Sequence, residues 1–313
     1  MTPASDTPTL ARPATSRGVA LSVTSTTLFA GLYYYATLLE PLSGIEIFGW
    51  RMLLTLPCVT LFLMLTGQWG RVVDVFARVR RNPALVLGLV ASSALLGVQL
   101  WLFLWAPLNG AALQVSLGYF LLPLSMLAVG RWLYGDRLTA LQKVAALSAA
   151  FGVGHEILRI GMPSWQALLV AIGLPVYFVL RRKLRTDHLG GLWFDMAFTV
   201  PVAAWCVLGQ GDVARAFAEA PRLFGLIPLL AVISAAAFMC YTVSSRMLSF
   251  SLFGLLGYVE PVLMLVVSLI LGERVKPDEW LTYVPIWGAV VLLVMDGALH
   301  VARTTARQAP AAS

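Results

Sequence analysis

The chain has 313 residues, of which 59% are hydrophobic and 12% charged, and its mean hydropathy is +0.83. A soluble domain cannot cover that much apolar surface, so the composition excludes a soluble globular protein and indicates an integral membrane protein. The formal net charge of +7 would suggest a nucleic-acid partner in a soluble protein. Basic residues of membrane proteins collect in cytoplasmic loops instead, so we expect no nucleic-acid partner.

The apolar segments predict ten membrane-crossing helices. Residues 1–17 are polar, contain three prolines and lack the apolar core of a signal peptide, which predicts a disordered tail. A helix needs about 20 apolar residues to cross a hydrocarbon core about 30 Å thick. Ten segments meet this requirement: 18–37, 44–66, 84–107, 111–132, 140–158, 162–181, 191–209, 222–245, 251–272 and 279–298. The connection 67–83 predicts a short surface helix against lipid headgroups.

The distribution of basic residues predicts the orientation in the membrane. Ten crossings put both termini on one side, and sixteen of the 22 lysines and arginines fall on that side, against five on the other. Basic residues mark the cytoplasmic side, so we expect both termini in the cytoplasm and the protein in the inner (plasma) membrane.

The two halves of the chain resemble each other. Val115–Arg137 recurs about 138 residues later as Ser251–Arg274, with glycine-tyrosine, proline, methionine and a glycine-acid-arginine ending in the same order. A spacing of 144 residues places Arg51 on Asp195. This predicts two five-helix halves, 18–158 and 162–298, followed by a cytoplasmic tail, 299–313. Because five is odd, the second half must insert upside down, as in many secondary transporters.

Arg51 is an arginine within the second predicted span, where a charge costs about 2.5–3.5 kcal/mol on insertion scales. Two interpretations stay open. Arg51 could bind an anionic group of a substrate, or it could form a structural ion pair with Asp195 or Glu46.

Glu260 and Pro261 interrupt the apolar stretch 251–272. A carboxylate that meets each side of the membrane in turn could carry a proton, which makes Glu260 the candidate for proton coupling. The alternative is a polar cap at a helix break that Pro261 causes.

Aromatic and amide side chains within the spans are candidates for the walls of a substrate cavity. Some of these residues could instead serve helix–helix contacts or interfacial anchoring. The candidates are Tyr34, Gln99, Trp101, Trp105, Gln114, Tyr119, Tyr177, Tyr241 and Tyr258.

Motifs of several other classes are missing from the sequence. It contains no phosphate-binding G-x-x-x-x-G-K-[ST] loop, no H-E-x-x-H metal motif and no G-x-S-x-G nucleophile elbow. We therefore expect no catalytic residues, no metal and no cofactor. A membrane-bound enzyme or sensor stays a less favoured alternative.

Four motifs carry a resemblance to a known family. The five-plus-five pattern resembles the EamA drug/metabolite transporters, and Ser116–Leu124, Gly257–Pro261, Leu180–Leu184 and Gly49–Arg51 resemble the RarD-type branch, the chloramphenicol-sensitivity proteins. The resemblance implies a central cavity lined by the first, third, fourth, sixth, eighth and ninth spans.

The predicted function is a secondary transporter that works in exchange for protons, through a cavity that opens to either side in turn. The resemblance implies the direction and the cargo, which are export and small metabolites or drug-like compounds. The expected partners are a small-molecule substrate, protons and the lipid bilayer. A facilitated uniporter or importer is the alternative within this class, and the sequence does not indicate the oligomeric state.

Overall fold

The computed structural model describes residues 14–108, 112–161, 164–209, 213–270 and 277–308, and all regular structure in these residues is helical. The α-helices are α1 (Ala14–Ala36), α2 (Gly44–Leu65), α3 (Gly70–Arg81), α4 (Ala84–Leu108), α5 (Ala112–Leu133), α6 (Ala140–Ile160), α7 (Trp165–Leu184), α8 (Leu189–Leu208), α9 (Val213–Glu219), α10 (Leu223–Met247), α11 (Phe250–Leu256), α12 (Val259–Ile270) and α13 (Trp280–Gln308). Two 3₁₀ turns, Thr37–Leu39 and Pro277–Glu279, precede α2 and α13.

The helices follow the predicted segments, with three differences. The expected span 251–272 is two helices, the last helix continues past residue 298 to Gln308, and the short helix α9 was not expected. Residues 1–13 of the predicted tail and the glycine-acid-arginine ending at 272–274 lie outside the described residues.

Five segments of the described residues are long and apolar enough to cross a membrane: Gly44–Leu65, Ala84–Leu102, Leu189–Leu208, Leu223–Met247 and Pro277–Asp296. Shorter apolar helical stretches cover Gly118–Leu133 and Phe250–Leu263. The fold is therefore all-helical with several membrane-crossing helices.

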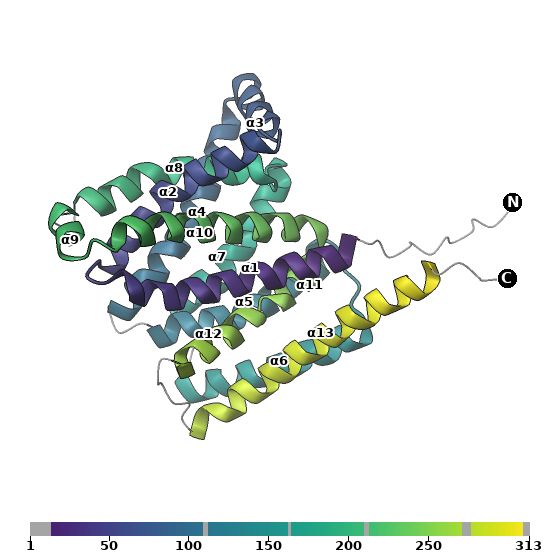
Figure 1. Ribbon diagram of the computed structural model, residues 1–313. Helices are drawn as coiled ribbons and strands as arrows, with labels where there is room; N and C mark the ends of the chain where they lie inside the picture. The colour runs from purple at the N-terminus through teal and green to yellow at the C-terminus, as the bar shows by residue number, and fades with distance from the viewer. Residues whose placement is uncertain (1–13, 109–111, 162–163, 210–212, 271–276, 309–313) are drawn as a thin grey trace, which may run out of the picture.

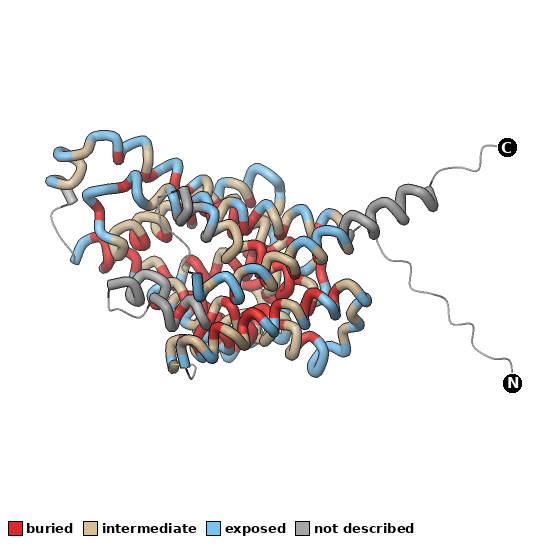
Figure 2. Tube along the Cα trace, turned by 90° about the horizontal axis from the view of Figure 1, so that it is seen from below, coloured by how far each residue is buried: buried red, intermediate tan, exposed pale blue. Residues whose placement is uncertain are grey.

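The bundle is held together by a few main helix pairs (Figure 1). α1 packs on α10, α2 on α8, α5 on α7 and α11, and α6 on α13, while α4 lies against α7 and α8. Buried residues gather between the helices and exposed residues on their outer faces (Figure 2). Most outward-facing side chains of the apolar helices are large hydrophobic residues, as lipid contact requires.

The break between α11 and α12 has a local cause. Proline at 261 has no N–H, and its ring clashes with the carbonyl four residues earlier, at Gly257. The Gly257 carbonyl instead accepts from the Glu260 N–H at 3.2 Å, in a tighter turn. Pro123 of α5 does not break its helix, so the same residue type has different outcomes in the two halves.

The glycine-acid-arginine motif of the first half fixes the start of α11. The Asp136 carboxylate accepts from the Ser251 N–H at 2.8 Å, and the Ser249 side chain caps the same helix. Gly130 and Gly254 allow α5 and α11 to approach closely, because a Cβ at Gly130 would meet Ser251 and one at Gly254 would meet Met126. α5 and α11 therefore form a tight pair that positions the break.

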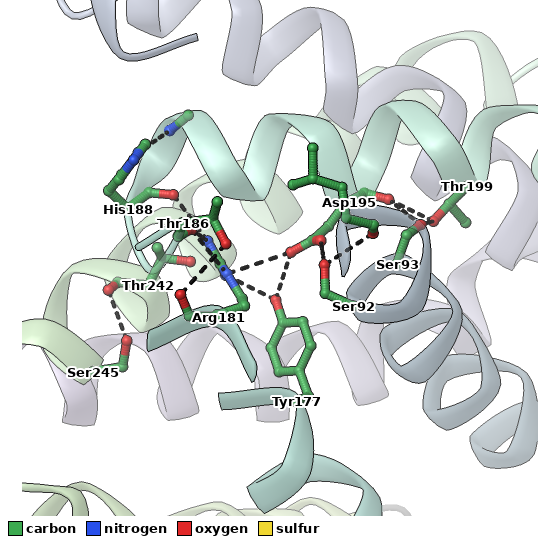
Figure 3. A network of polar contacts seen from close by, with 12 residues as sticks. Ser92, Ser93, Tyr177, Arg181, Thr186, His188, Asp195, Thr199, Thr242 and Ser245 are labelled. Atoms are coloured by element: carbon green, nitrogen blue, oxygen red, sulfur yellow. Dashed lines mark hydrogen bonds and ion pairs between the residues drawn. The ribbon is translucent and has the colours of Figure 1, made fainter. Parts of the chain in front are cut away.

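A buried polar network joins α4, α7 and α8 (Figure 3). Asp195 of α8 lies 3.6 Å from the Arg181 guanidinium and accepts from the Tyr177 hydroxyl at 2.9 Å and from Ser92. Arg181 also donates to the Thr186 and His188 carbonyls at the turn between α7 and α8. Asp195 and Arg181 are 1% and 2% exposed, so both charges are satisfied inside the protein.

His188 forms the N-cap of α8. Its Nδ1 accepts from the Gly190 N–H at 3.1 Å, which requires a neutral ring protonated on Nε2. Burial, together with the neighbouring guanidinium groups of Arg246 and Arg181, lowers the pKa of His188 to about 4.

We expect Asp195→Ala to lower the free energy of unfolding by about 3 kcal/mol or more, because it leaves the buried Arg181 charge without its carboxylate. Asp187→Ala removes a half-exposed ion pair with Arg246 and should cost under about 1 kcal/mol. Unfolding of both variants in detergent checks the prediction, and equal losses would contradict it.

The stability of the protein should fall as the pH drops from about 6.5 toward 4, because the unfolded chain protonates His188 and the folded chain does not. Asn in place of His188 keeps a capping oxygen and cannot titrate. The unfolding temperature of His188→Asn should therefore decline less between pH 7 and pH 5 than that of the native chain. Parallel declines would show that His188 does not contribute.

Candidate functional site

A cavity lies beside the break between α11 and α12. Its volume is about 30 Å³, which is room for one or two water molecules. Side chains and backbone from α1, α5, α7, α10 and α11–α12 line it: Ser22, Thr26, Tyr119, Leu122, Pro123, Met126, Phe178, Tyr241, Phe253, Gly254, Gly257, Glu260 and Pro261. The cavity therefore lies between elements of both halves of the chain.

Glu260 is the only acidic residue among the described lining residues. The break places it in the first turn of α12, where it lines the cavity. Among the described residues, the carboxylate has no hydrogen bond and no direct ion pair. An unsatisfied carboxylate among apolar helices is costly, so this group needs a proton or a ligand as its partner.

Arg51 of α2 lies close enough to Glu260 and Tyr119 for the three groups to interact electrostatically. Its Nε donates to the Ser234 hydroxyl of α10 at 3.0 Å, and its guanidinium stacks over Phe238 and Phe29 at 5.2 and 5.7 Å from the ring centroids. The aromatic faces and the serine therefore hold this charge in place of a direct ion pair.

Of the two interpretations of Arg51, the structural ion pair with Asp195 or Glu46 is not among the contacts of the described residues. Asp195 pairs with Arg181 instead. Glu46 accepts from the Ser43 N–H and hydroxyl at 2.8 and 2.7 Å in a capping box at the start of α2. The spacing of 144 residues placed Arg51 and Asp195 at matching positions of the two halves, but residues at matching positions need not be neighbours in space.

An aromatic wall extends from Arg51 to the cavity. Phe29 contacts Phe238 and Tyr241, and Tyr241 contacts Phe253 and Phe178 with ring centroids 4.9 and 5.6 Å apart. Phe178 and Phe253 also meet edge to face at 5.2 Å. The wall offers flat apolar surfaces, with the Tyr241 hydroxyl as its polar group.

Of the candidate residues, Tyr119, Tyr241 and Glu260 line the cavity, and Arg51 lies beside them. The other candidates with described side chains lie elsewhere. Tyr177 belongs to the Asp195 network, Tyr258 donates to the Phe120 carbonyl at 3.1 Å, and Gln99 donates to the Leu169 carbonyl at 2.8 Å. Tyr34 and Trp101 are 41% and 44% exposed, and the side chains of Trp105 and Gln114 lie outside the described part of the structure.

The sequence did not single out Ser22, Phe178 or Phe253 as cavity residues. Single serines and phenylalanines are common in membrane helices and carry no signal of their own. Arg181 ends the predicted span 162–181 and was counted among the basic residues of the cytoplasmic side, not as a partner for a buried charge. Its spacing of four from Tyr177, which puts both on one helix face, was the available signal.

No protein-family model matches the chain, but most of its sequence is similar to known proteins. It is 44% identical over 283 residues to the chloramphenicol-sensitive protein RarD of Pseudomonas aeruginosa, covering 90% of this chain and 95% of that protein. It is 38% identical to an uncharacterized transporter of Pasteurella multocida over 92% of this chain and 98% of the relative, and 25% identical to protein RarD of Escherichia coli over 94% and 98%.

A solved crystal structure has a similar fold, with a TM-score of 0.63 over 90% of this chain and 98% of that chain, at 16% identity. The full-length similarity to the named relatives confirms what the motifs at Gly49–Arg51, Ser116–Leu124, Leu180–Leu184 and Gly257–Pro261 indicated. The chain belongs to the RarD family of membrane transporters.

Proposed function

We propose that the protein is a secondary active transporter that exports small metabolites or drug-like compounds from the cell in exchange for protons. The observation that carries the proposal is Glu260, which lines the cavity at a helix break and whose carboxylate has no direct partner among the described residues. Broken helices near the middle of the membrane are a recurring feature of secondary-transporter sites.

The packing of the helices supports two inverted five-helix repeats, 18–158 and 162–298. Exchanging the halves turns α1 into α7, α2 into α8, α4 into α10, α5 into α11–α12, and α6 into α13. The exchange converts the contact between α1 and α10 into one between α7 and α4. It converts α5–α7 into α12–α1 and α4–α8 into α10–α2 in the same way, and all six helix pairs are in contact. The pairs α2–α8, α5–α11 and α6–α13 convert into themselves, as pairs on a two-fold axis do.

Individual hydrogen bonds follow the same exchange. Thr282 donates to Glu156 at 2.6 Å, and Gln142 donates to Asp296 at 2.8 Å. Each donor and each acceptor is 140 residues from its counterpart in the other half. These two bonds join α6 and α13 near their opposite ends and are the two-fold equivalents of each other.

The two charges at matching positions, Arg51 and Asp195, have matching environments as well. Arg51 of α2 bonds to Ser234 of α10, while Asp195 of α8 bonds to Ser92 of α4. The exchange of halves converts the first helix pair into the second. We infer that the Asp195 arrangement is a fixed structural ion pair, whereas the Arg51 arrangement lies beside the transport cavity.

Ten crossings with both termini in the cytoplasm fit this arrangement, with α11 and α12 together forming one crossing. α1 begins and α13 ends on the same side of the bundle (Figure 1). The basic residues at the α7–α8 turn and on α3 mark the cytoplasmic side, in the inner membrane.

Exchange requires that substrate and proton use the site in turn. The cavity of about 30 Å³ is too small for a drug-sized molecule, for which sites of about 300–1,000 Å³ are usual. Helices of the two halves must therefore separate to admit a substrate. In each open conformation, Glu260 would meet one side of the membrane and could load or release its proton there.

The relative from Pseudomonas aeruginosa is described as chloramphenicol-sensitive, which makes chloramphenicol a reasonable first test compound. A second set of test compounds consists of those whose abundance in the culture medium differs between overexpressing and deletion cells. Flux of both sets into proteoliposomes, with and without a pH gradient, tests the function. Product formation without flux would identify an enzyme, and flux that ignores the gradient would identify a uniporter.

We expect Glu260→Gln to lose accumulation driven by the pH gradient and to keep substrate-for-substrate exchange. One proton exchanged per substrate supports roughly tenfold accumulation per pH unit, because a proton gradient of one pH unit and a tenfold substrate gradient both correspond to about 1.4 kcal/mol. Asp74→Asn, which changes an exposed carboxylate on α3, is the control and should behave as the native chain. Gradient-driven accumulation by Glu260→Gln would refute coupling through this residue.

Arg51→Gln should abolish transport with little loss of stability, because Arg51 leaves no directly paired carboxylate behind among the described residues. Arg181→Gln is the matched comparison and should lower the unfolding temperature, because Asp195 loses its buried partner. Flux and thermal unfolding measured on both variants separate the roles. Normal flux through Arg51→Gln would leave Arg51 a purely structural residue.

A further inference from the structure

The short helix α3 lies at the ends of four longer helices, α2, α4, α7 and α8. It connects α2 to α4 and packs along α8 at the edge of the bundle (Figure 1). Its own residues Val72 and Val75 are buried against the bundle. A Cβ on Gly190 would lie 2.6 Å from the Arg71 carbonyl, so the two backbones approach closely at the start of α8.

Arg78 joins α3 to the end of α7. Its guanidinium donates to the Leu184 and Arg185 carbonyls at 2.6 and 3.0 Å. These carbonyls belong to the last turn of α7, where helix carbonyls have no partner of their own and the helix dipole favours a cation. The contact brings the arginines of α3 next to the basic run that ends α7.

Five exposed basic side chains gather at this junction, and we call them the basic surface: Arg71, Arg80 and Arg81 of α3, with Lys183 and Arg185 at the end of α7. Within the part of the chain that the structure describes, none of the five forms an ion pair with a carboxylate. Of the nearby carboxylates, Asp187 lies 3.6 Å from Arg246, and Asp74 is exposed on α3 itself. The surface therefore keeps an uncompensated positive charge.

The same helix exposes apolar side chains beside these charges. Val73 and Phe76 are 51% and 49% exposed, and the Arg80 guanidinium lies 4.8 Å above the Phe76 ring. Valine and phenylalanine next to arginines, on a helix at the ends of membrane-crossing helices, match the boundary between acyl chains and headgroups.

We propose that the basic surface binds the headgroups of anionic phospholipids, with Val73 and Phe76 inserted beside their acyl chains. The charge of the surface is complementary to the phosphates, and guanidinium groups are well suited to hold phosphate. The contacts of α3 with α7 and α8 hold the guanidinium groups of α3 in position. Bound lipid would therefore stabilise the folded chain at the turn that joins α7 to α8, independently of the transport cavity.

The test uses the full-length chain in mixed micelles of neutral detergent and phosphatidylcholine. Thermal unfolding is followed while phosphatidylglycerol with the same acyl chains replaces phosphatidylcholine. The unfolding temperature should rise with phosphatidylglycerol and stay constant with further phosphatidylcholine. The rise should largely disappear when the ionic strength goes from 0.1 to about 1 M, where the Debye length falls from about 10 to about 3 Å.

The variant Arg80→Gln/Arg81→Gln should need roughly tenfold or more phosphatidylglycerol for the same rise. The matched control, Arg303→Gln/Arg307→Gln, removes two charges from the C-terminal segment and should titrate as the native chain does. Soluble glycerol phosphate is the third arm and should have no effect.

Three results would each overturn the proposal: equal effects of both lipids, equal titrations of the two variants, or an equal rise with glycerol phosphate, which would indicate a site for small anions. If Arg80→Gln/Arg81→Gln does not fold, the salt dependence of the native chain decides. A rise that persists at 1 M ionic strength would then exclude headgroup charge as its cause.

Discussion

The low dielectric of the membrane interior is the constraint on which the rest of this structure depends. A charge placed there must be neutralised, hydrogen-bonded or exposed to a cavity. Asp195 meets this requirement through Arg181, Tyr177 and Ser92, and the four groups join α4, α7 and α8. The same constraint makes Glu260 exceptional, because the described residues offer it no such set of partners.

The difference between the halves follows from a few residues. Pro123 and Pro261 lie at matching positions, yet α5 continues through its proline and the second half divides into α11 and α12. Where the first half has Leu122, the second has Glu260, and both residues line the cavity. In the proposed inverted repeat, the carboxylate in one half is the single acidic group among the described lining residues, which fits the proposed exchange of substrate for protons.

Helix positions were predictable from the sequence because the length of a membrane-crossing helix and the signals at its ends are local properties. The capping boxes at Ser43–Glu46 and Thr139–Gln142 and the basic end of α7 mark ends within a few residues of those predicted. The surroundings of individual side chains were less apparent from the sequence. Tyr177 and Tyr258 resembled cavity residues but serve buried hydrogen bonds, because the direction of a side chain depends on which helices surround it.

The sequence by itself determined that the chain is a helical membrane protein, where its helices lie and which charges within them need an explanation. Only the tertiary structure decided which partner each charge has. Arg51 contacts Ser234, Phe29 and Phe238 instead of Asp195. Asp195 pairs with Arg181, which from the sequence was counted only among the basic residues of the cytoplasmic side. The physical reason is that helix formation and membrane insertion follow from local composition. Ion pairing follows from contacts between helices far apart in the chain, which local composition does not specify.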